Sequence, residues 1–98
     1  MRLNYFVSNI KNLHVLVAED NTIYGKFIQS LLTEYGIKSD MVEDGLQVVE
    51  KIKSNKYDIV LMDVKMPVMD GYQATAIIRN DMRNDIPIIA MTATDNVE

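Results

Sequence analysis

An aspartate stands directly after the most apolar stretch of the chain. In "YDIVLMDVKMPVMDG", Tyr57 to Gly71, Asp63 follows the run Ile-Val-Leu-Met. A continuous apolar run is typical of a strand buried on both faces, so its end is an unusual place for a charge. Taken alone, Asp63 is most simply a turn residue that leads to Pro67, because Asp and Pro are common in turns. A chemical role for it depends on what the fold brings beside it.

Two further acids end another apolar run. "HVLVAEDN" places Glu19 and Asp20 after a strand-like segment far from Asp63 in the sequence. If the two runs are neighbouring parallel strands, the three carboxylates meet at one edge of the sheet. Such carboxylates repel, so at least one takes up a proton unless a cation is present. Mg²⁺ suits them, since it is usually held by one or two carboxylates and keeps waters that a phosphate replaces. Thr92, near the end of a later apolar run, would bring a hydroxyl to the same edge.

The elements that would position these groups alternate along the chain. Apolar runs predict strands at 14–18, 37–42, 58–62 and 86–93, and helical spacing predicts helices at 23–36, 45–55 and 72–80. The first helix carries six apolar residues at helical spacing, and Gly36 is typical of its C-terminal end. These six are Ile23, Phe27, Ile28, Leu31, Leu32 and Tyr35. The second helix places Leu46, Val49 and Ile52 on one face. This alternation indicates an α/β protein whose parallel sheet is covered by helices on both faces.

The composition limits the possible function. Ninety-eight residues, 48% hydrophobic and 24% charged, suit one small globular domain with a single core. The absence of cysteine excludes disulfides and thiolate metal sites. A net charge of −4 has the wrong sign for holding nucleic-acid phosphates directly. No apolar stretch is long enough to predict insertion into a membrane, so a cytoplasmic location is expected. The single histidine, His14, starts a strand where it can reach solvent.

Three segments together resemble a known family. "LVAEDN", "DIVLMDVKMPVMDG" and "IPIIAMTA", in this order, resemble the receiver domain of two-component response regulators, most closely the receivers attached to hybrid sensor histidine kinases. The resemblance implies a flavodoxin-like doubly wound parallel sheet with strand order 2-1-3-4. It covers Leu13 to the end, so residues 1–12 are interpreted as a leader or interdomain linker and residues 13–98 as the receiver. The parent protein would then be a hybrid sensor histidine kinase.

The resemblance also implies a role for each acid. Asp63 would accept a phosphoryl group from a phosphohistidine on a histidine kinase or a histidine phosphotransfer domain. Asp20 and Asp63 would hold Mg²⁺ together with the backbone carbonyl of Lys65, and Glu19 would act through bound water. No enzymatic activity is expected beyond the domain's own phosphorylation and dephosphorylation.

The resemblance further implies a set of supporting residues. Thr92 and Ala93 would bind the phosphoryl group, and Thr92 would switch the conformation. Lys65 and Thr94 would tune how long the phosphoryl group survives. Pro67 and Gly71 would shape the loop beneath the site.

The chain departs from the family pattern in two places. Family members continue through a fourth helix, a fifth strand that carries a phosphoryl-binding lysine, and a fifth helix, whereas this sequence ends at Glu98. The predicted strand 86–93, whose side chains suggest burial on both faces, would then form an apolar sheet edge, and we expect self-association through it. In addition, Tyr24 replaces the Asn usual in close relatives and precedes Gly25, which costs about 1 kcal/mol inside a helix.

Two other functions stay open at this stage. The first is an interaction module with the receiver fold that is never phosphorylated. The second is a phosphatase of the haloacid-dehalogenase type, which also uses an aspartate nucleophile and Mg²⁺. That family needs a second aspartate two residues after the first, where this sequence has Lys65.

Overall fold

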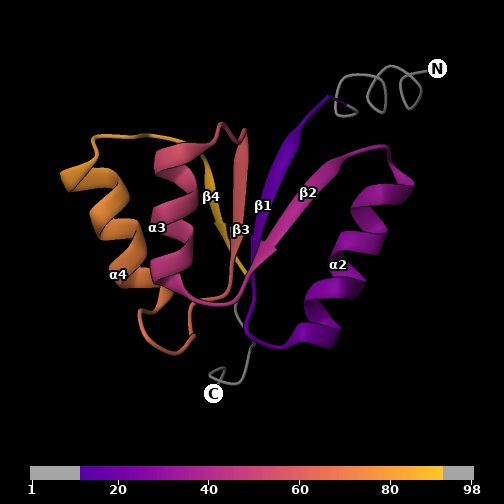
Figure 1. Ribbon diagram of the computed structural model, residues 1–98, viewed down its shortest axis with the longest axis horizontal. Helices are drawn as coiled ribbons and strands as arrows, with labels where there is room; N and C mark the ends of the chain where they lie inside the picture. Colours follow the sequence, from indigo (N-terminus) through magenta and orange to yellow (C-terminus); the bar gives the residue numbers. More distant parts are fainter. Residues whose placement is uncertain (1–11, 92–98) are drawn as a thin grey trace.

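The computed structural model describes residues 12–91, and these form an alternating α/β domain (Figure 1). Almost all of the predicted leader 1–12, and the predicted site residues Thr92, Ala93 and Thr94, lie outside the described residues. The elements in chain order are β1 (His14–Ala18), α2 (Thr22–Glu34), β2 (Lys38–Val42), α3 (Gly45–Ser54), β3 (Ile59–Met62), α4 (Gly71–Ala76), the π-helical turn η1 (Ile77–Asp81) and β4 (Ile88–Ala90). Within residues 12–91, no helix is long and apolar enough to cross a membrane.

All four strands are parallel and lie in the order β2-β1-β3-β4. The register places Ala18 of β1 between Val42 of β2 and Met62 of β3, and Met62 beside Ala90 of β4. In Figure 1, α2 lies on one side of the sheet, and α3 and α4 lie on the other. The predicted fold class and strand order are therefore confirmed.

Two apolar clusters fill the space between the sheet and its helices, because successive strand residues point to opposite faces. Leu16, Ala18, Val60 and Met62 pack with the buried residues of α3 and α4. Val15, Val17 and Ile37 form the smaller cluster, against which Ile28 and Leu32 of α2 pack. The core is thus split by the sheet, and its larger part lies under α3 and α4.

Helix α3 corrects one predicted face. Val49 and Ile52 are buried as expected, but Leu46 is 44% exposed and Val48 is fully buried instead. The buried stripe runs through Gly45, Val48, Val49 and Ile52, which follows the 3.6-residue period more closely than a strict spacing of three.

The ends of α2 follow from its sequence. Asn21 caps the first turn, since its side-chain oxygen accepts the N–H of Tyr24 at 3.0 Å. At the other end Gly36 adopts φ 77° and donates to the carbonyl of Thr33, while Ile37 donates to that of Leu32. These two bonds form a Schellman motif and confirm the expected glycine at the helix end.

The apolar face of α2 is only partly covered. Of its six predicted apolar residues, Ile28 and Leu32 pack on the sheet. The other four are between 43% and 83% exposed: Ile23, Phe27, Leu31 and Tyr35. They follow one another at intervals of four residues, so they form a single stripe along the helix. Among residues 12–91, no element covers this stripe.

The fourth strand is shorter and more exposed than predicted. β4 comprises only three residues, of which Ile88 is partly buried, while Ile89 is 50% exposed and Ala90 is exposed. The prediction that this strand is buried on both faces is therefore wrong. The reason lies in its position, because within the described residues β4 pairs only with β3 and stands at the edge of the sheet.

Candidate functional site

The carboxyl ends of β1 and β3 bring the three predicted acids together. Glu19 and Asp20 directly follow β1, and Asp63 directly follows β3, its parallel neighbour. Backbone bonds extend the ladder past the strand ends, since Asp63 donates to the carbonyl of Ala18 at 2.9 Å and Glu19 donates to that of Val42 at 3.0 Å. One carboxylate oxygen from each acid lies within 4.8 Å of the other two. Residues distant in sequence thus form one cluster.

The three acids differ in exposure. Glu19 is only 5% exposed, Asp63 is partly buried and Asp20 is exposed. Burial, followed by the negative charges of Asp63 and Asp20, raises the pKa of Glu19 above its ordinary value, against the opposing effect of a hydrogen bond from the N–H of Asn21 at 3.0 Å. The cluster therefore holds more negative charge than its surroundings compensate, as the sequence had led us to expect.

This donor set fits a hard divalent cation. Carboxylate oxygens are the ligands that magnesium and calcium prefer, and magnesium needs only one or two of them alongside water. The partly buried Asp63 and the exposed Asp20 leave room for such waters, whereas the buried Glu19 has less access to them. A bound cation would offset the mutual repulsion that raises the pKa of Glu19.

The loop after Asp63 is held against the strand end by Gly71. Its N–H donates to the carbonyl of Val64 at 2.8 Å. A Cβ atom at this position would lie 2.7 Å from the carbonyl oxygen of Asp63 and 3.0 Å from the Cα of Val64. Both neighbours are backbone atoms, so no side chain fits without moving the residue that carries the candidate site.

A tight turn forms the tip of this loop. Met69 donates to the carbonyl of Pro67 at 2.7 Å across Val68, which adopts φ 68°. This three-residue turn is a strained type, and a β-branched residue in the left-handed region is uncommon. Val68 is also 77% exposed. No sequence pattern predicts this conformation, since valine normally avoids it.

A second glycine fixes the loop from the side of α3. Gly45 donates to the carbonyl of Met69 at 2.7 Å, and a Cβ atom at Gly45 would collide with that same oxygen. Sequence reasoning treated Gly45 only as the start of a helix. The signal that could have identified it is its place directly after the helix-capping Asp44, where a glycine permits close backbone approach.

Of the remaining predicted site residues, the structure describes Lys65 but not Thr92, Ala93 and Thr94. The Lys65 N–H lies 3.4 Å from an Asp63 carboxylate oxygen, longer than an ordinary hydrogen bond, so Lys65 stays beside the acid cluster without fixing it tightly. Met91, the last described residue, donates to the carbonyl of Met62, which brings the chain to the same edge of the sheet as Asp63. Thr92, Ala93 and Thr94 lie beyond it, and their roles stay predictions.

Comparison with known proteins gives a consistent result. The family model described as "Response regulator receiver domain" matches residues 15–98. Among curated relatives, the peroxide stress-activated histidine kinase mak1 of Schizosaccharomyces pombe is 48% identical over 86 residues, covering 81% of this chain and 5% of the kinase. The transcription factor SKN7 of Saccharomyces cerevisiae is 40% identical over 89 residues, covering 91% of this chain and 14% of that protein. The chain thus spans only a small part of the length of these relatives.

Solved structures give the same picture. The receiver domain of the Francisella response regulator 1452 superposes with a TM-score of 0.81 at 32% identity, covering 88% of this chain and 70% of that one. The receiver domain of the sensor histidine kinase PA1611 from Pseudomonas aeruginosa PAO1 gives 0.78 at 36% identity, covering 88% and 71%. The latter structure has a magnesium ion coordinated in its active site cleft.

Proposed function

Because the chain belongs to the response regulator receiver domain family, and so to the phosphoacceptor domains of two-component signalling, we propose that Asp63 is its phosphorylated residue. The observation that carries this proposal is the meeting of Glu19, Asp20 and Asp63 within 4.8 Å at the end of β3. Of the three, Asp63 is the one whose backbone is enclosed by the Gly71 loop. A nucleophile must be held in position, and this enclosure does so.

The proposed cofactor is Mg²⁺. Asp20 and Asp63 would contribute carboxylate oxygens and Lys65 its backbone carbonyl, while Glu19 would act through bound water. When bound, the ion would supply positive charge that offsets the approach of a phosphoryl group to a cluster of carboxylates. Burial is the main cause of the raised pKa of Glu19, and the negative charges of Asp63 and Asp20 add to it; this mutual repulsion supports the assignment.

The proposed reaction is a phosphoryl transfer from a phosphohistidine. A carboxylate oxygen of Asp63 attacks the phosphorus atom, a P–O bond forms and the P–N bond breaks, and the released imidazole takes a proton from water. The transition state of such transfers is loose, so positioning and charge neutralisation provide most of the acceleration. Thr92 and Ala93 are proposed to bind the transferred group, and Thr94 and Lys65 to influence its lifetime.

The proposed donor is a histidine kinase or a histidine phosphotransfer domain. Such a protein must bring its phosphohistidine to the edge of the sheet at Asp63, where α2 begins. Ile23, in the first turn of α2, is 83% exposed, and Phe27 one turn later is 57% exposed. Exposed apolar side chains that close to the acids support docking of a protein rather than capture of a small molecule alone.

Self-association through β4 is a further part of the proposal. Its outer edge is unpaired within the described residues, and Ile89 beside it is half exposed. Apolar edges of this kind favour pairing with another chain. A purely monomeric mass in light scattering at working concentration would contradict this part and leave the assignment of Asp63 unaffected.

The test of the assignment is phosphoryl uptake. The chain is incubated with Mg²⁺ and either phosphoramidate or a phosphohistidine protein, and intact mass is measured. We expect one phosphoryl group per chain, absent in Asp63→Asn and retained in Asp58→Asn, an acid before the other end of the same strand. A folded chain that takes up nothing from either donor would instead favour the unphosphorylated interaction module. Sustained hydrolysis of phosphate monoesters would favour the phosphatase, against which Lys65 already argues.

A further inference from the structure

One glycine allows helix α2 to lie directly on the sheet beside the acid cluster. Within α2, all of which is described, Gly25 is the one buried residue. A Cβ atom at this position would collide with Sδ of Met41 on β2 and would lie 3.6 Å from the Cβ of Glu19. The thioether of Met41 therefore occupies the space that any side chain at position 25 would need.

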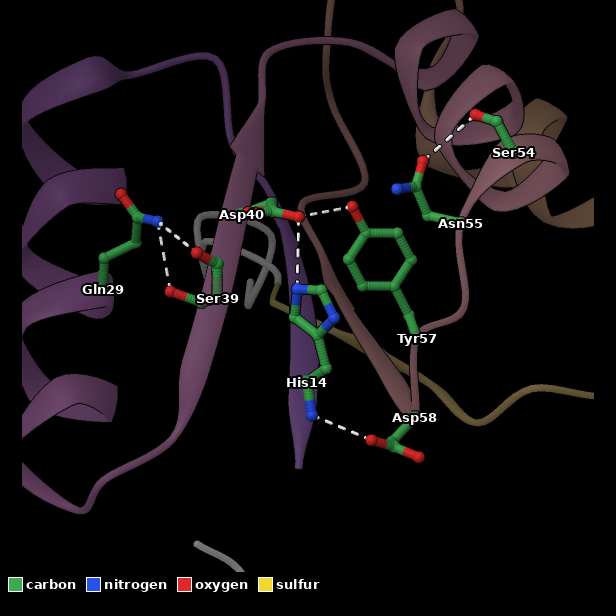
Figure 2. Close-up of polar contacts among 8 residues, drawn as sticks. All are labelled: His14, Gln29, Ser39, Asp40, Ser54, Asn55, Tyr57 and Asp58. Atoms are coloured by element: carbon green, nitrogen blue, oxygen red, sulfur yellow. Dashed lines mark hydrogen bonds and ion pairs between the residues drawn. The ribbon is translucent and has the colours of Figure 1, made fainter. Parts of the chain in front are cut away.

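A second contact joins the same helix and strand one turn further along. Nε2 of Gln29 donates to the carbonyl of Ser39 at 3.2 Å and to its hydroxyl at 3.1 Å (Figure 2). Gln29 follows Gly25 by four residues and shares its face of α2, and Ser39 precedes Met41 by two residues and shares its face of β2. The helix is thus held on β2 at two neighbouring points, of which Gly25 is the one nearer its first turn.

The first turn of α2 also holds Glu19. The Asn21 N–H donates to Oε2 of Glu19 at 3.0 Å, and the Asn21 carbonyl accepts the N–H of Gly25 at 2.9 Å. A carboxylate oxygen of Glu19 lies within 4.8 Å of one from Asp20 and one from Asp63. A displacement of the first turn would therefore reach the acid cluster through Glu19.

We propose that Gly25 is a positioning residue for Glu19. Because it has no side chain, it accepts the thioether of Met41, and this keeps the first turn of α2 close to the sheet and the Asn21 N–H on the carboxylate of Glu19. A side chain at position 25 would press against Met41. Since α2 is also held at Gln29, part of the displacement would tilt its first turn away from the strand, and Glu19 would lose the donor that orients it.

The consequence for metal binding rests on the proposed function. Groups that orient a metal site without touching the ion typically change its metal affinity by about 10–100-fold when they are lost. Gly25 acts one step further from the ion, through Asn21 and Glu19. We therefore expect a smaller change, a loss of Mg²⁺ affinity of about threefold or more.

The test is a pair of substitutions, Gly25→Ala and Met41→Val, made singly and together. Valine has no atom in place of Sδ, and the Cγ of Met41 lies 3.5 Å from the added Cβ, an ordinary contact. The double variant should therefore regain the helix position that Gly25→Ala loses. Ser30→Ala is the matched control, because it introduces the same residue at an exposed position of the same helix. Alanine favours the helix in both single variants, so both should fold.

The first readout needs no metal. Hydrogen exchange of the Asn21 amide, followed by NMR in the intact chain, should become about threefold faster or more in Gly25→Ala, because its acceptor is displaced. The rate should return to its original value in the double variant and stay unchanged in Ser30→Ala. An unchanged rate in Gly25→Ala would overturn the proposal, since Met41 would then move aside while the helix stays. A faster rate that Met41→Val fails to restore would overturn it as well.

The second readout is the affinity for Mg²⁺, measured by calorimetry in the same variants. We expect binding about threefold weaker or more in Gly25→Ala and restored in the double variant. Equal affinity in Gly25→Ala and in the unchanged chain would overturn the role of Gly25 in metal binding. A folded, unchanged chain that binds no Mg²⁺ would contradict the proposed function instead, and the exchange rates would still decide whether Gly25 positions Glu19.

Discussion

Carboxylates toward the two ends of the sheet have opposite environments, and their pKa values shift in opposite directions. Toward the amino ends of the strands, Asp40 in the middle of β2 receives a hydrogen bond from Tyr57, which precedes β3, and lies beside His14, the first residue of β1; its pKa is lowered. At the carboxyl ends, Glu19 is more buried and faces Asp63 and Asp20, and its pKa is raised. The first arrangement satisfies a negative charge with protein groups. The second arrangement concentrates negative charge, which a bound cation would compensate.

The difference separates residues that hold the fold from residues prepared for a ligand. A carboxylate that accepts hydrogen bonds and faces no like charge stabilises the native state, whereas carboxylates that repel one another lower its stability until a cation binds. Sequence spacing alone does not separate the two, because both ends carry acids beside apolar strands. The following changes, from the largest expected effect to the smallest, test whether the separation holds.

The largest effect should come from exchanging the two ends' aspartates for asparagine. We expect Asp63→Asn to lower phosphoryl uptake by about a hundredfold or more, because it removes the nucleophile. Its urea midpoint should not fall, since the hydrogen bond that the Asp63 side chain accepts within residues 12–91 is the long one from the Lys65 N–H, and the substitution removes a charge that repels Glu19. Asp40→Asn should do the reverse, with uptake retained and stability reduced. Intact mass measures phosphoryl uptake, and urea unfolding measures stability. Loss of uptake in Asp40→Asn would contradict the separation between the phosphorylation site and the residues that stabilise the fold.

Glycine substitutions should also distinguish a rigid site from an adaptable core. Gly71→Ala should destabilise the domain by about 2–4 kcal/mol, because its Cβ would meet backbone atoms of Asp63 and Val64 that cannot move independently. Gly25→Ala is the matched control. There the Cβ meets the side chain of Met41, which can rotate, and alanine gains about 1 kcal/mol of helix propensity. Its net change in urea unfolding should therefore stay within about 1 kcal/mol. Equal losses in both variants would contradict this explanation.

Metal binding should stabilise the carboxyl end alone. At a concentration of 100 times its dissociation constant, Mg²⁺ should add about 2.7 kcal/mol to the free energy of unfolding. Because the pKa of Glu19 is raised in the folded chain, ionising it costs stability as the pH rises above the unfolded value. Removal of Mg²⁺ should thus cost more at pH 7 than at pH 5. Asp20→Asn should reduce the Mg²⁺ effect, while Asp40→Asn should not, as followed by thermal unfolding with and without a chelator.

The amino end should show the opposite pH dependence. The lowered pKa of Asp40 means that its contribution to stability is present above the unfolded value of 3.8 and is lost as the pH falls through the lower folded value. Tyr57→Phe removes the main cause of that shift, and we expect a loss of about 1 kcal/mol at pH 7. The difference between the two proteins in urea should shrink below pH 4. A constant difference would mean that the Tyr57 hydroxyl acts by packing alone.

Most of the architecture, and the meeting of the acids, could be predicted because the information is local. Apolar runs and helical spacing identified the strands and helices, Gly36 identified a helix end, and parallel topology then required Glu19 and Asp63 to share an edge. What could not be predicted depends on neighbours. The exposure of Ile89 reflects the absence of a described strand beyond β4, and the ring contact of His14 depends on a side chain of β2.

The conformation of Val68 is the clearest case of a feature that sequence reasoning cannot reach, and it gives the smallest predicted effect. A left-handed backbone costs an L-residue about 1–2 kcal/mol, and Val68→Gly would relieve that cost while adding about 0.5–1 kcal/mol of chain entropy to lose on folding. The net result should be a gain in urea stability of about 1 kcal/mol or less. Val64→Gly, where φ is not positive, should only destabilise. If Val68→Gly destabilises as much as Val64→Gly does, the turn is not strained. If it stabilises, Val68 strains the loop beside Asp63. Because this side chain is 77% exposed, we would then expect it to contact a binding partner rather than the rest of the chain.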